Sequence, residues 1–324
     1  MRRREFIALL GGTAVAWPSP LGAQQATRRP RLGVLLYSNP ETDPNMESFR
    51  RGLRDLGYVD GQNIAIEYRY AEGKPERLPQ LAAELVALKP DLVFGLGGDV
   101  APFLSKATQT IPIIYAMSAD PVQLGLAASL ARPGGNATGV TFLADELAAK
   151  RLEVLKDAAP RISRVAFLWN PDHADNELDG ARRAAATHGV QLRSIEVRGV
   201  GDLERAFNAA TQSGVDAVYV VSSRHTVANI RGIVDFATKN RLPLAGGWGA
   251  WVQAGGLVSY GPNVGEMVGR AAGYVDKVLK GAKPGELPVQ QPTRFELLVN
   301  LKTAKALDLT ISESFLSRAD KVIE

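Results

Sequence analysis

The sequence predicts an α/β protein of two doubly wound, Rossmann-like lobes joined by hinge crossovers. Apolar segments of strand length alternate with segments of helical period, and this alternation occurs twice along the chain. The length of 324 residues is sufficient for two domains, each with its own core. Strands that alternate with helices form βαβ units, so we expect a mainly parallel sheet in each lobe.

The first series of elements starts with a continuous apolar segment, which is typical of a strand buried on both faces of a sheet. Its helices carry apolar residues at helical spacing and end at Gly57 or before Pro90. In chain order we expect a strand at 32–37, a helix at 46–56, a strand at 63–70, a helix at 77–88, a strand at 91–95, a helix that ends at 106 and a strand at 113–116.

The second series repeats landmarks of the first. The string RLGVLLYSNP from Arg31 resembles RVAFLWNP from Arg164, and PDLVFGLGG from Pro90 resembles VDAVYVVSS from Val215. The separation between the members of each pair is nearly constant, which indicates two lobes of similar topology. The residues after Tyr260 are too few for a third lobe, so we expect them to cross back and complete both sheets. The predicted lobes are 31–143 with about 263–288, and 144–262 with about 289–324.

The N-terminus predicts an export signal that is not part of the fold. Basic residues at the start precede a mostly apolar segment, 6–17, and small residues near Ala23, which is the order of a signal peptide. The pair Arg3 and Arg4 resembles a twin-arginine signal. We expect removal of 1–23 and a soluble periplasmic protein. A membrane anchor is the alternative, but the apolar segment is shorter than the ~20 residues that span a bilayer.

The composition excludes several classes of function. The absence of cysteine rules out disulfides, thiol nucleophiles and Cys-ligated zinc. The net charge of +4 comes partly from the predicted signal, and no basic run elsewhere indicates nucleic-acid binding. No GxSxG, HExxH, Walker A or complete GxGxxG motif is present. We therefore expect no catalytic residues, no metal and no cofactor. His188 precedes a helix-ending glycine, whereas His173 and His225 follow strand ends and are candidate ligand contacts.

Polar and aromatic residues follow the predicted strands of both lobes. In open α/β sheets, ligands bind outside the carboxyl ends of the strands. A turn or cap role is the alternative for each residue alone. Because both lobes carry such a set, we expect a shared cleft that closes by hinge motion. The predicted ligand-binding residues are Tyr37, Ser38, Asn39, Gly98, Asp99, Ser118, Asp120, Asn170, Asp172, Ser223, Arg224, Trp248 and Tyr260.

Several strings carry a family resemblance: GYVDGQN at 57–63, PDLV at 90–93, DPV at 120–122, RPGGNATGV at 132–140 and WNP at 169–171. With them, the chain resembles the type I periplasmic solute-binding proteins of ABC transporters, especially the branch associated with uptake of tryptophan or other aromatic amino acids. The likeness covers nearly the whole chain after the signal. It implies a protein that binds a small organic solute between its lobes and delivers it to a membrane permease.

Two loops of the second lobe change the ligand that we expect from the resemblance. Relatives that hold a free amino acid tend to offer an acidic residue from the second lobe, but 222–225 and 246–249 contain none. Arg224 instead offers a guanidinium suited to a carboxylate. We therefore predict an organic anion with an aromatic or apolar body. An amino-acid-like solute is the alternative, with Asp99, Asp120 or Asp172 receiving its ammonium group.

Two further functions remain as alternatives. A periplasmic ligand-sensing subunit of a signalling system would have the same fold, and the sequence does not separate it from a transport subunit. A two-lobed α/β enzyme is less favoured, because racemases of that build commonly use paired cysteines and nucleotide sugars are cytoplasmic. A repressor would need a DNA-reading helix-turn-helix where the signal lies.

Overall fold

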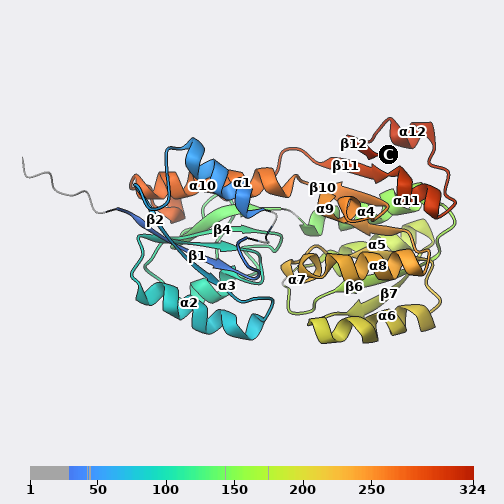
Figure 1. Ribbon diagram of the computed structural model, residues 1–324, viewed down its shortest axis with the longest axis horizontal. Helices are drawn as coiled ribbons and strands as arrows, with labels where there is room; N and C mark the ends of the chain where they lie inside the picture. The colour runs from blue at the N-terminus through green and yellow to red at the C-terminus, as the bar shows by residue number, and fades with distance from the viewer. Residues whose placement is uncertain (1–28, 42, 44, 143, 174) are drawn as a thin grey trace, which may run out of the picture.

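The computed structural model describes residues 29–324 except 42, 44, 143 and 174. These residues form two lobes, each with a central sheet flanked by helices (Figure 1). The predicted export signal lies outside the described residues. Within the described part of the chain, no helix is long and apolar enough to cross a membrane.

The first lobe is built on a five-stranded sheet in the order β2-β1-β3-β4-β5, with every neighbouring pair parallel. The predicted elements of the first series are all present, with ends that differ by one or two residues. They are β1 (Arg31–Leu36), α1 (Met46–Asp55), β2 (Ala65–Tyr70), the 3-10 helix η1 (Pro75–Arg77), α2 (Leu78–Ala87), β3 (Leu92–Leu96), α3 (Ala101–Ala107), β4 (Ile113–Met117) and β5 (Ala137–Thr141).

The second lobe is built on a seven-stranded sheet in the order β12-β11-β10-β9-β8-β6-β7. Its strand pairs are parallel except β10 with β11. The first elements are α4 (Ala144–Ala158), β6 (Arg164–Trp169), α5 (Glu177–His188), β7 (Gln191–Glu196), η2 (Val200–Asp202), α6 (Leu203–Gln212), β8 (Ala217–Val220), α7 (Arg224–Ala228), α8 (Ile230–Lys239), β9 (Leu244–Gly246), α9 (Gly249–Gln253) and β10 (Val258–Gly261).

The last part of the chain returns to both sheets. The long helix α10 (Val264–Leu279) lies against α1 of the first lobe (Figure 1), where a Cβ on Gly52 would meet the Gly269 carbonyl oxygen at 2.6 Å. Gln290 then forms a bridge to Val140 in β5. The remaining elements are η3 (Pro284–Glu286), β11 (Glu296–Asn300), α11 (Leu301–Ala306), α12 (Glu313–Leu316) and β12 (Lys321–Ile323).

The internal repeat is confirmed by matching strand orders and matching side-chain contacts. The order β2-β1-β3-β4 in the first sheet corresponds to β7-β6-β8-β9 in the second. The Asp91 carboxylate accepts from the Arg31 backbone N–H at 2.7 Å, and Asp216 accepts from Arg164 N–H at 2.8 Å. In both lobes, therefore, an aspartate before one strand fixes the start of its neighbour.

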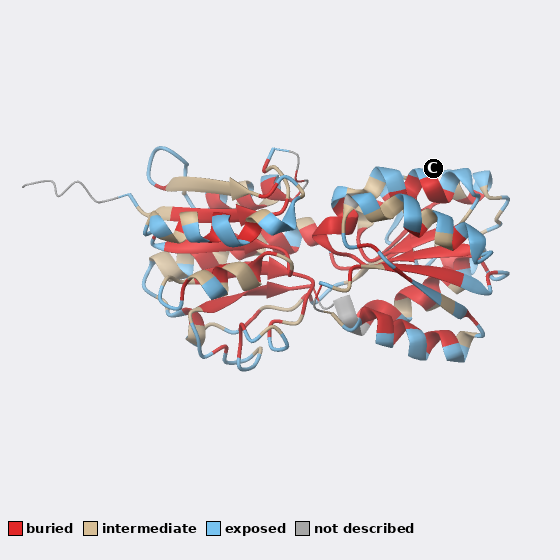
Figure 2. Cartoon of the chain, turned by 90° about the horizontal axis from the view of Figure 1, so that it is seen from below, coloured by how far each residue is buried: buried red, intermediate tan, exposed pale blue. Residues whose placement is uncertain are grey.

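Apolar residues fill the space between each sheet and its helices. Figure 2 shows the strands largely buried and the outer faces of the helices exposed. Stacked aromatic pairs support both cores, with ring centroids 4.2 Å apart for Phe49 and Phe94 and 4.8 Å apart for Phe167 and Tyr219. These cores fix where the strands end, and the loops beyond those ends meet between the lobes.

Candidate functional site

Loops that follow β3 and β4 in the first lobe contact the loop that follows β6 in the second. The imidazole Nδ1 of His173 is hydrogen-bonded to a carboxylate oxygen of Asp99. The Ser118 hydroxyl lies 3.0 Å from His173 Nε2 and donates to the Ser222 carbonyl oxygen at 3.0 Å. Since Ser118 uses its single hydrogen on Ser222, its oxygen accepts from His173 Nε2–H. Both ring nitrogens of His173 therefore donate, and the ring is an imidazolium.

The electrostatics of this contact agree with the hydrogen bonds. Burial opposes charge on His173, but the Asp99 carboxylate outweighs it and raises the pKa of the imidazole to about 9. Burial likewise disfavours the charged form of Asp99, yet His173 and the Arg224 backbone N–H, 3.2 Å away, lower the pKa of that carboxyl. The pair is thus charged on both sides at neutral pH. Behind it, burial and Glu177 raise the pKa of Asp175 to about 7.

A second contact joins the loop after β1 to helix α7. The Tyr37 hydroxyl donates to the Gly73 carbonyl oxygen at 2.9 Å and lies 3.0 Å from His225 Nδ1. The Tyr37 oxygen therefore accepts from Nδ1–H. Burial lowers the pKa of His225, so the ring is neutral and its Nε2 is an acceptor. Nε2 is buried and has no hydrogen-bond partner among the described residues.

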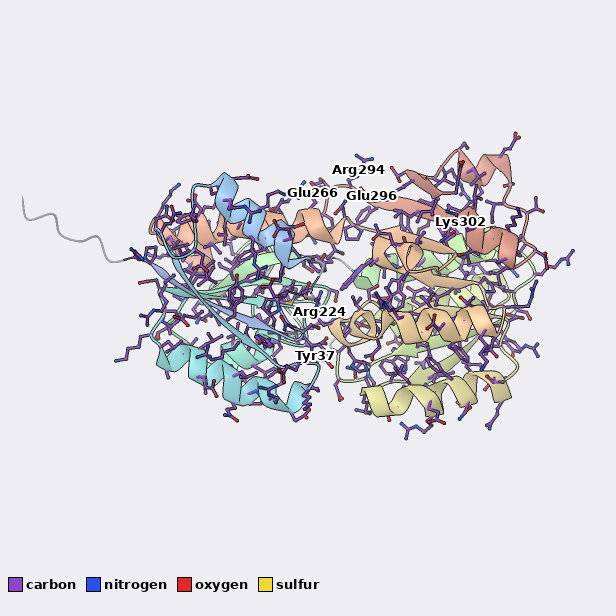
Figure 3. All side chains as sticks on the ribbon, in the orientation of Figure 1. Tyr37, Arg224, Glu266, Arg294, Glu296 and Lys302 are labelled. Carbon is purple, nitrogen blue, oxygen red and sulfur yellow. The ribbon has the colours of Figure 1, made fainter. Side chains whose placement is uncertain are left out.

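A third contact is an ion pair between Arg224, the first residue of α7, and Asp43 in the loop before α1. Both side chains are almost fully buried, with exposed fractions of 4% and 1%. Burial lowers the pKa of Arg224 to about 10, which leaves the guanidinium charged at neutral pH. Its Nη2 binds Asp43, whereas Nε and Nη1 are buried without a partner in the described structure. Figure 3 shows Arg224 and Tyr37 at the junction of the lobes.

Helix α7 holds its position through its own cap and through a glycine in the opposite lobe. The Ser223 hydroxyl accepts from the Thr226 backbone N–H at 3.2 Å, and Thr226 completes a capping box. Gly97 has a φ of +116°, and a Cβ there would lie 2.4 Å from Arg224 Cγ. The Arg224 stem therefore passes directly over a position where only glycine fits.

Two cavities adjoin these contacts. One of about 790 Å³ is lined by Asp43, Arg224 and residues of α8 and α9. Another of about 430 Å³ shares Val227, Ala250 and Gln253 with the first and is also lined by Trp248. The Trp248 ring makes an edge contact with Phe142, their centroids being 6.0 Å apart. Hollows of this size suit a small organic molecule.

The structure brings together only some of the predicted site residues. Tyr37, Asp99, Ser118 and Arg224 lie in the three contacts, and Gly98 is adjacent, since a Cβ there would be 3.0 Å from His173 Cε1. Ser38 lines the larger cavity, Trp248 the smaller, and Ser223 caps α7.

The other predicted residues make local polar contacts, and Asn39 also lines a cavity of about 330 Å³ with Ala228 and Asn229 of the second lobe. The side chains of Asn39, Asp120 and Asn170 accept backbone N–H groups two residues further along. Asp172 pairs with Arg198 at 2.8 Å, and both side chains are at least half exposed. The Tyr260 carbonyl oxygen accepts from buried Arg151 Nε at 2.8 Å. None of these polar contacts crosses between the lobes.

Sequence reasoning missed Asp43 and left His173 and His225 as open candidates. Asp43 lies in a loop several residues beyond β1, in no motif, and no spacing marks it. His173 lies in the loop after β6 and His225 is the second residue of α7, so their position near strand ends was the available signal.

Comparison with known proteins decides the family. A family model described as ABC transporter substrate binding protein matches residues 34–323. The chain belongs to this family. A tyrosine-binding protein from Clostridioides difficile (strain R20291) is 27% identical over 277 residues, covering 85% of this chain and 79% of the relative.

Two solved structures with 28% sequence identity agree with this assignment. The crystal structure of an ABC domain in complex with L-Trp from Streptococcus pneumonia is 28% identical and has a TM-score of 0.84; the match covers 91% of this chain and 100% of that chain. A conserved domain protein from Vibrio cholerae gives the same identity, TM-score and coverage. The resemblance found in the sequence is thus confirmed: this is the substrate-binding component of an ABC transporter, not an enzyme, with a type I periplasmic binding fold.

Proposed function

We propose that this ABC transporter substrate-binding protein binds an aromatic amino acid between its two lobes and delivers it to a membrane permease. The observation that carries the proposal is the set of buried polar contacts that join the lobes, with partnerless atoms on Arg224 and His225. Relatives that bind tyrosine or L-Trp support the ligand class.

The buried junction supports a cleft in which both lobes contact the ligand. Closing would bring Tyr37, Asp99 and Ser118 of the first lobe against α7 and the loop after β6 of the second. We propose that the lobes are 31–143 with about 263–288, and 144–262 with about 289–324. The contact of α10 with α1 supports the return of the chain to the first lobe.

The ligand class departs from the organic anion predicted from the sequence. That prediction took Arg224 as an unmatched cation facing the cleft. Asp43 already matches the charge of Arg224, so a purely anionic ligand would add an unbalanced negative charge. Asp43 and Asp99 are buried carboxylates of the first lobe, whereas the anion prediction rested on the loops 222–225 and 246–249 of the second. A third buried carboxylate, Asp175, follows β6 of the second lobe.

The cellular location is part of the same proposal. We propose that residues 1–23 direct export, with cleavage after Ala23, and that the protein acts in the periplasm beside its permease. Arg3 and Arg4 support the twin-arginine route. Export would place the protein where it meets the solute before the permease does.

Calorimetric titration tests the ligand class. L-tryptophan, L-tyrosine and L-phenylalanine are titrated into the purified protein, with L-leucine and L-lysine as controls. We expect micromolar or tighter binding of at least one aromatic amino acid and none of L-lysine. If no aromatic amino acid binds, the ligand class is wrong. Loss of labelled aromatic amino acid uptake in a strain lacking the gene would separate transport from sensing.

A further inference from the structure

We infer that the interlobe ion pair of Asp43 and Arg224 is the recognition site for the ammonium and carboxylate groups of the ligand. The protein would then select a free, zwitterionic amino acid over the corresponding acid or amine. The inference rests on the proposed function. It adds the charges that the ligand must carry and the two residues that recognise them.

The pair joins the two lobes and would separate when they move apart. Asp43 belongs to the loop before α1 in the first lobe, and Arg224 begins α7 in the second. One Asp43 oxygen is fixed by the Asn45 backbone N–H at 3.0 Å, and the other faces Arg224. Opening the lobes therefore presents one oriented carboxylate and one guanidinium on opposite walls of the cleft.

The guanidinium has capacity beyond its present partner. Its Nη2 binds Asp43, whereas Nε and Nη1 are buried and have no partner among the described residues. Buried donors left without acceptors are costly, and a planar carboxylate can accept two parallel bonds from a guanidinium. A ligand carboxylate would satisfy donors that Asp43 does not reach.

The surrounding charges favour a ligand with no net charge. Asp43 balances Arg224, Asp99 balances the imidazolium of His173, and the imidazole of His225 is neutral. Asp175 also lies 3.6 Å from His173 Nε2, and burial raises the pKa of this carboxyl to about 7. A zwitterion inserted between Asp43 and Arg224 gives each a new opposite charge and leaves the buried total unchanged. An acid leaves Asp43 without a cation and an amine leaves Arg224 without an anion, which is costly in a buried site.

Space and apolar surface are available beside the pair. The cavity of about 790 Å³ is lined by both residues, with Arg231 as a further charged residue that is exposed. Its lining includes Val227 and Ala250, which also line the cavity next to the Trp248 ring. An aromatic side chain attached to a zwitterionic head can therefore lie against these residues while its head occupies the ion pair.

Ligand analogues test the inference on the unmodified protein. The tightest-binding aromatic amino acid is compared by calorimetry with its deaminated acid and its decarboxylated amine, for example L-tryptophan with indole-3-propionate and tryptamine. We expect each analogue to bind at least about 30-fold more weakly, the scale of leaving one buried charge unpaired. Equal affinity for the amino acid and either analogue would overturn the inference and leave the proposed ligand class intact.

Variants then assign each group to its residue. Asp43→Asn should weaken amino acid binding at least about 30-fold and spare or strengthen binding of the acid, whereas Arg224→Gln should do the same with the amine. Asp308→Asn and Arg241→Gln, which alter an exposed ion pair of the second lobe, are matched controls expected to leave all affinities unchanged. Equal losses for all three ligands in both variants would overturn the inference, because a structural role does not distinguish ligand charge. Failure of every aromatic amino acid to bind would instead overturn the proposed function.

Discussion

Asp99 and His173 form a buried ion pair across the two lobes, with an aspartate after β3 and a histidine after β6. The exposed fractions of their side chains are 10% and 0%. Ser118 extends the contact to the Ser222 carbonyl oxygen, so the loops after β3, β4, β6 and β8 share one hydrogen-bonded chain. Because the residues come from different lobes, the free energy of this chain contributes to closure.

Asp99→Asn is expected to favour the open form. The variant keeps the size of the side chain but removes the charge that matches His173, and opening lets water hydrate the imidazolium. A hydrogen bond between charged groups is worth about 1.5–3 kcal/mol, so ligand affinity should fall about ten- to hundredfold. Small-angle scattering of the ligand-free protein should give a larger radius of gyration than the wild type. Asp308→Asn serves as control, and an unchanged radius and affinity would contradict the role of the pair.

Closure should weaken as the pH rises toward 9. Burial opposes the charge on His173, but Asp99, Asp175 and Glu177 together raise the pKa of the imidazole to about 9, compared with an ordinary value of about 6.5. Of these carboxylates, only Asp99 belongs to the first lobe and is lost when the lobes separate. A raised pKa means that closure binds a proton, so the contribution of His173 is complete below about pH 6.5 and is lost as the pH passes through 9. Calorimetric affinities at pH 6.5, 7.5 and 9 should fall in that order. His173→Gln should flatten the profile, and an equally steep profile in that variant would refute the assignment.

The topology could be predicted from the sequence, because each strand and helix leaves a local pattern and the repeat duplicates it. Asp91 and Asp216 are an example, because they occupy matching positions in the repeated strings and each accepts a backbone N–H at the start of the neighbouring strand. The repeated strings therefore specify the same strand pairing in both lobes. Side-chain direction could not be predicted this way. Asp172 follows a strand end as Asp99 does, yet it turns outward to Arg198, and this choice depends on contacts that only the folded lobes create.

The ion pair of Asp43 and Arg224 shows that the partner of a correctly predicted residue also could not be predicted from the sequence. Arg224 follows a strand end and was predicted, but its partner Asp43 is separated from it by most of the chain. No spacing rule connects them, since their distance is set by how the two lobes meet. Because Asp43 pairs with Arg224, the ligand that we now propose is a zwitterion and not the predicted anion. The predicted location of the ligand, between the lobes, is unchanged.

Glu177→Gln is expected to destabilise the second lobe. Glu177 and Arg151 form a fully buried ion pair at 3.0 Å, and the Tyr219 hydroxyl donates to the same Glu177 oxygen at 3.1 Å. Removing one charge of a buried pair costs about 3–5 kcal/mol, because the other remains in the interior. The midpoint of urea unfolding, followed by circular dichroism, should fall. Combining Glu177→Leu with Arg151→Met should recover part of the loss, and a single variant as stable as the wild type would contradict this role.

Replacement of Arg3 and Arg4 by lysine tests the export proposal. A twin-arginine signal is read by a receptor that requires the guanidinium pair, so the double variant should remain in the cytoplasm. Cell fractionation and immunoblotting measure its distribution, with Arg2→Lys as control. The exported wild-type chain should begin at Gln24. Unchanged export of the double variant would refute the twin-arginine route and leave a general export signal.

Gly97→Ala should block closure. Gly97 has a φ of +116°, and an added Cβ would lie 2.4 Å from Arg224 Cγ in the opposite lobe. Backbone strain alone costs about 1–3 kcal/mol and acts within the first lobe, whereas the clash arises only when the lobes meet. Gly57→Ala separates the two effects, since Gly57 has a φ of +87° and nothing within 4 Å. Calorimetry should show at least tenfold weaker binding for Gly97→Ala and unchanged affinity for Gly57→Ala, with both variants folded by circular dichroism. Equal affinity losses in the two variants would attribute the effect to strain and remove the steric argument for closure around Arg224.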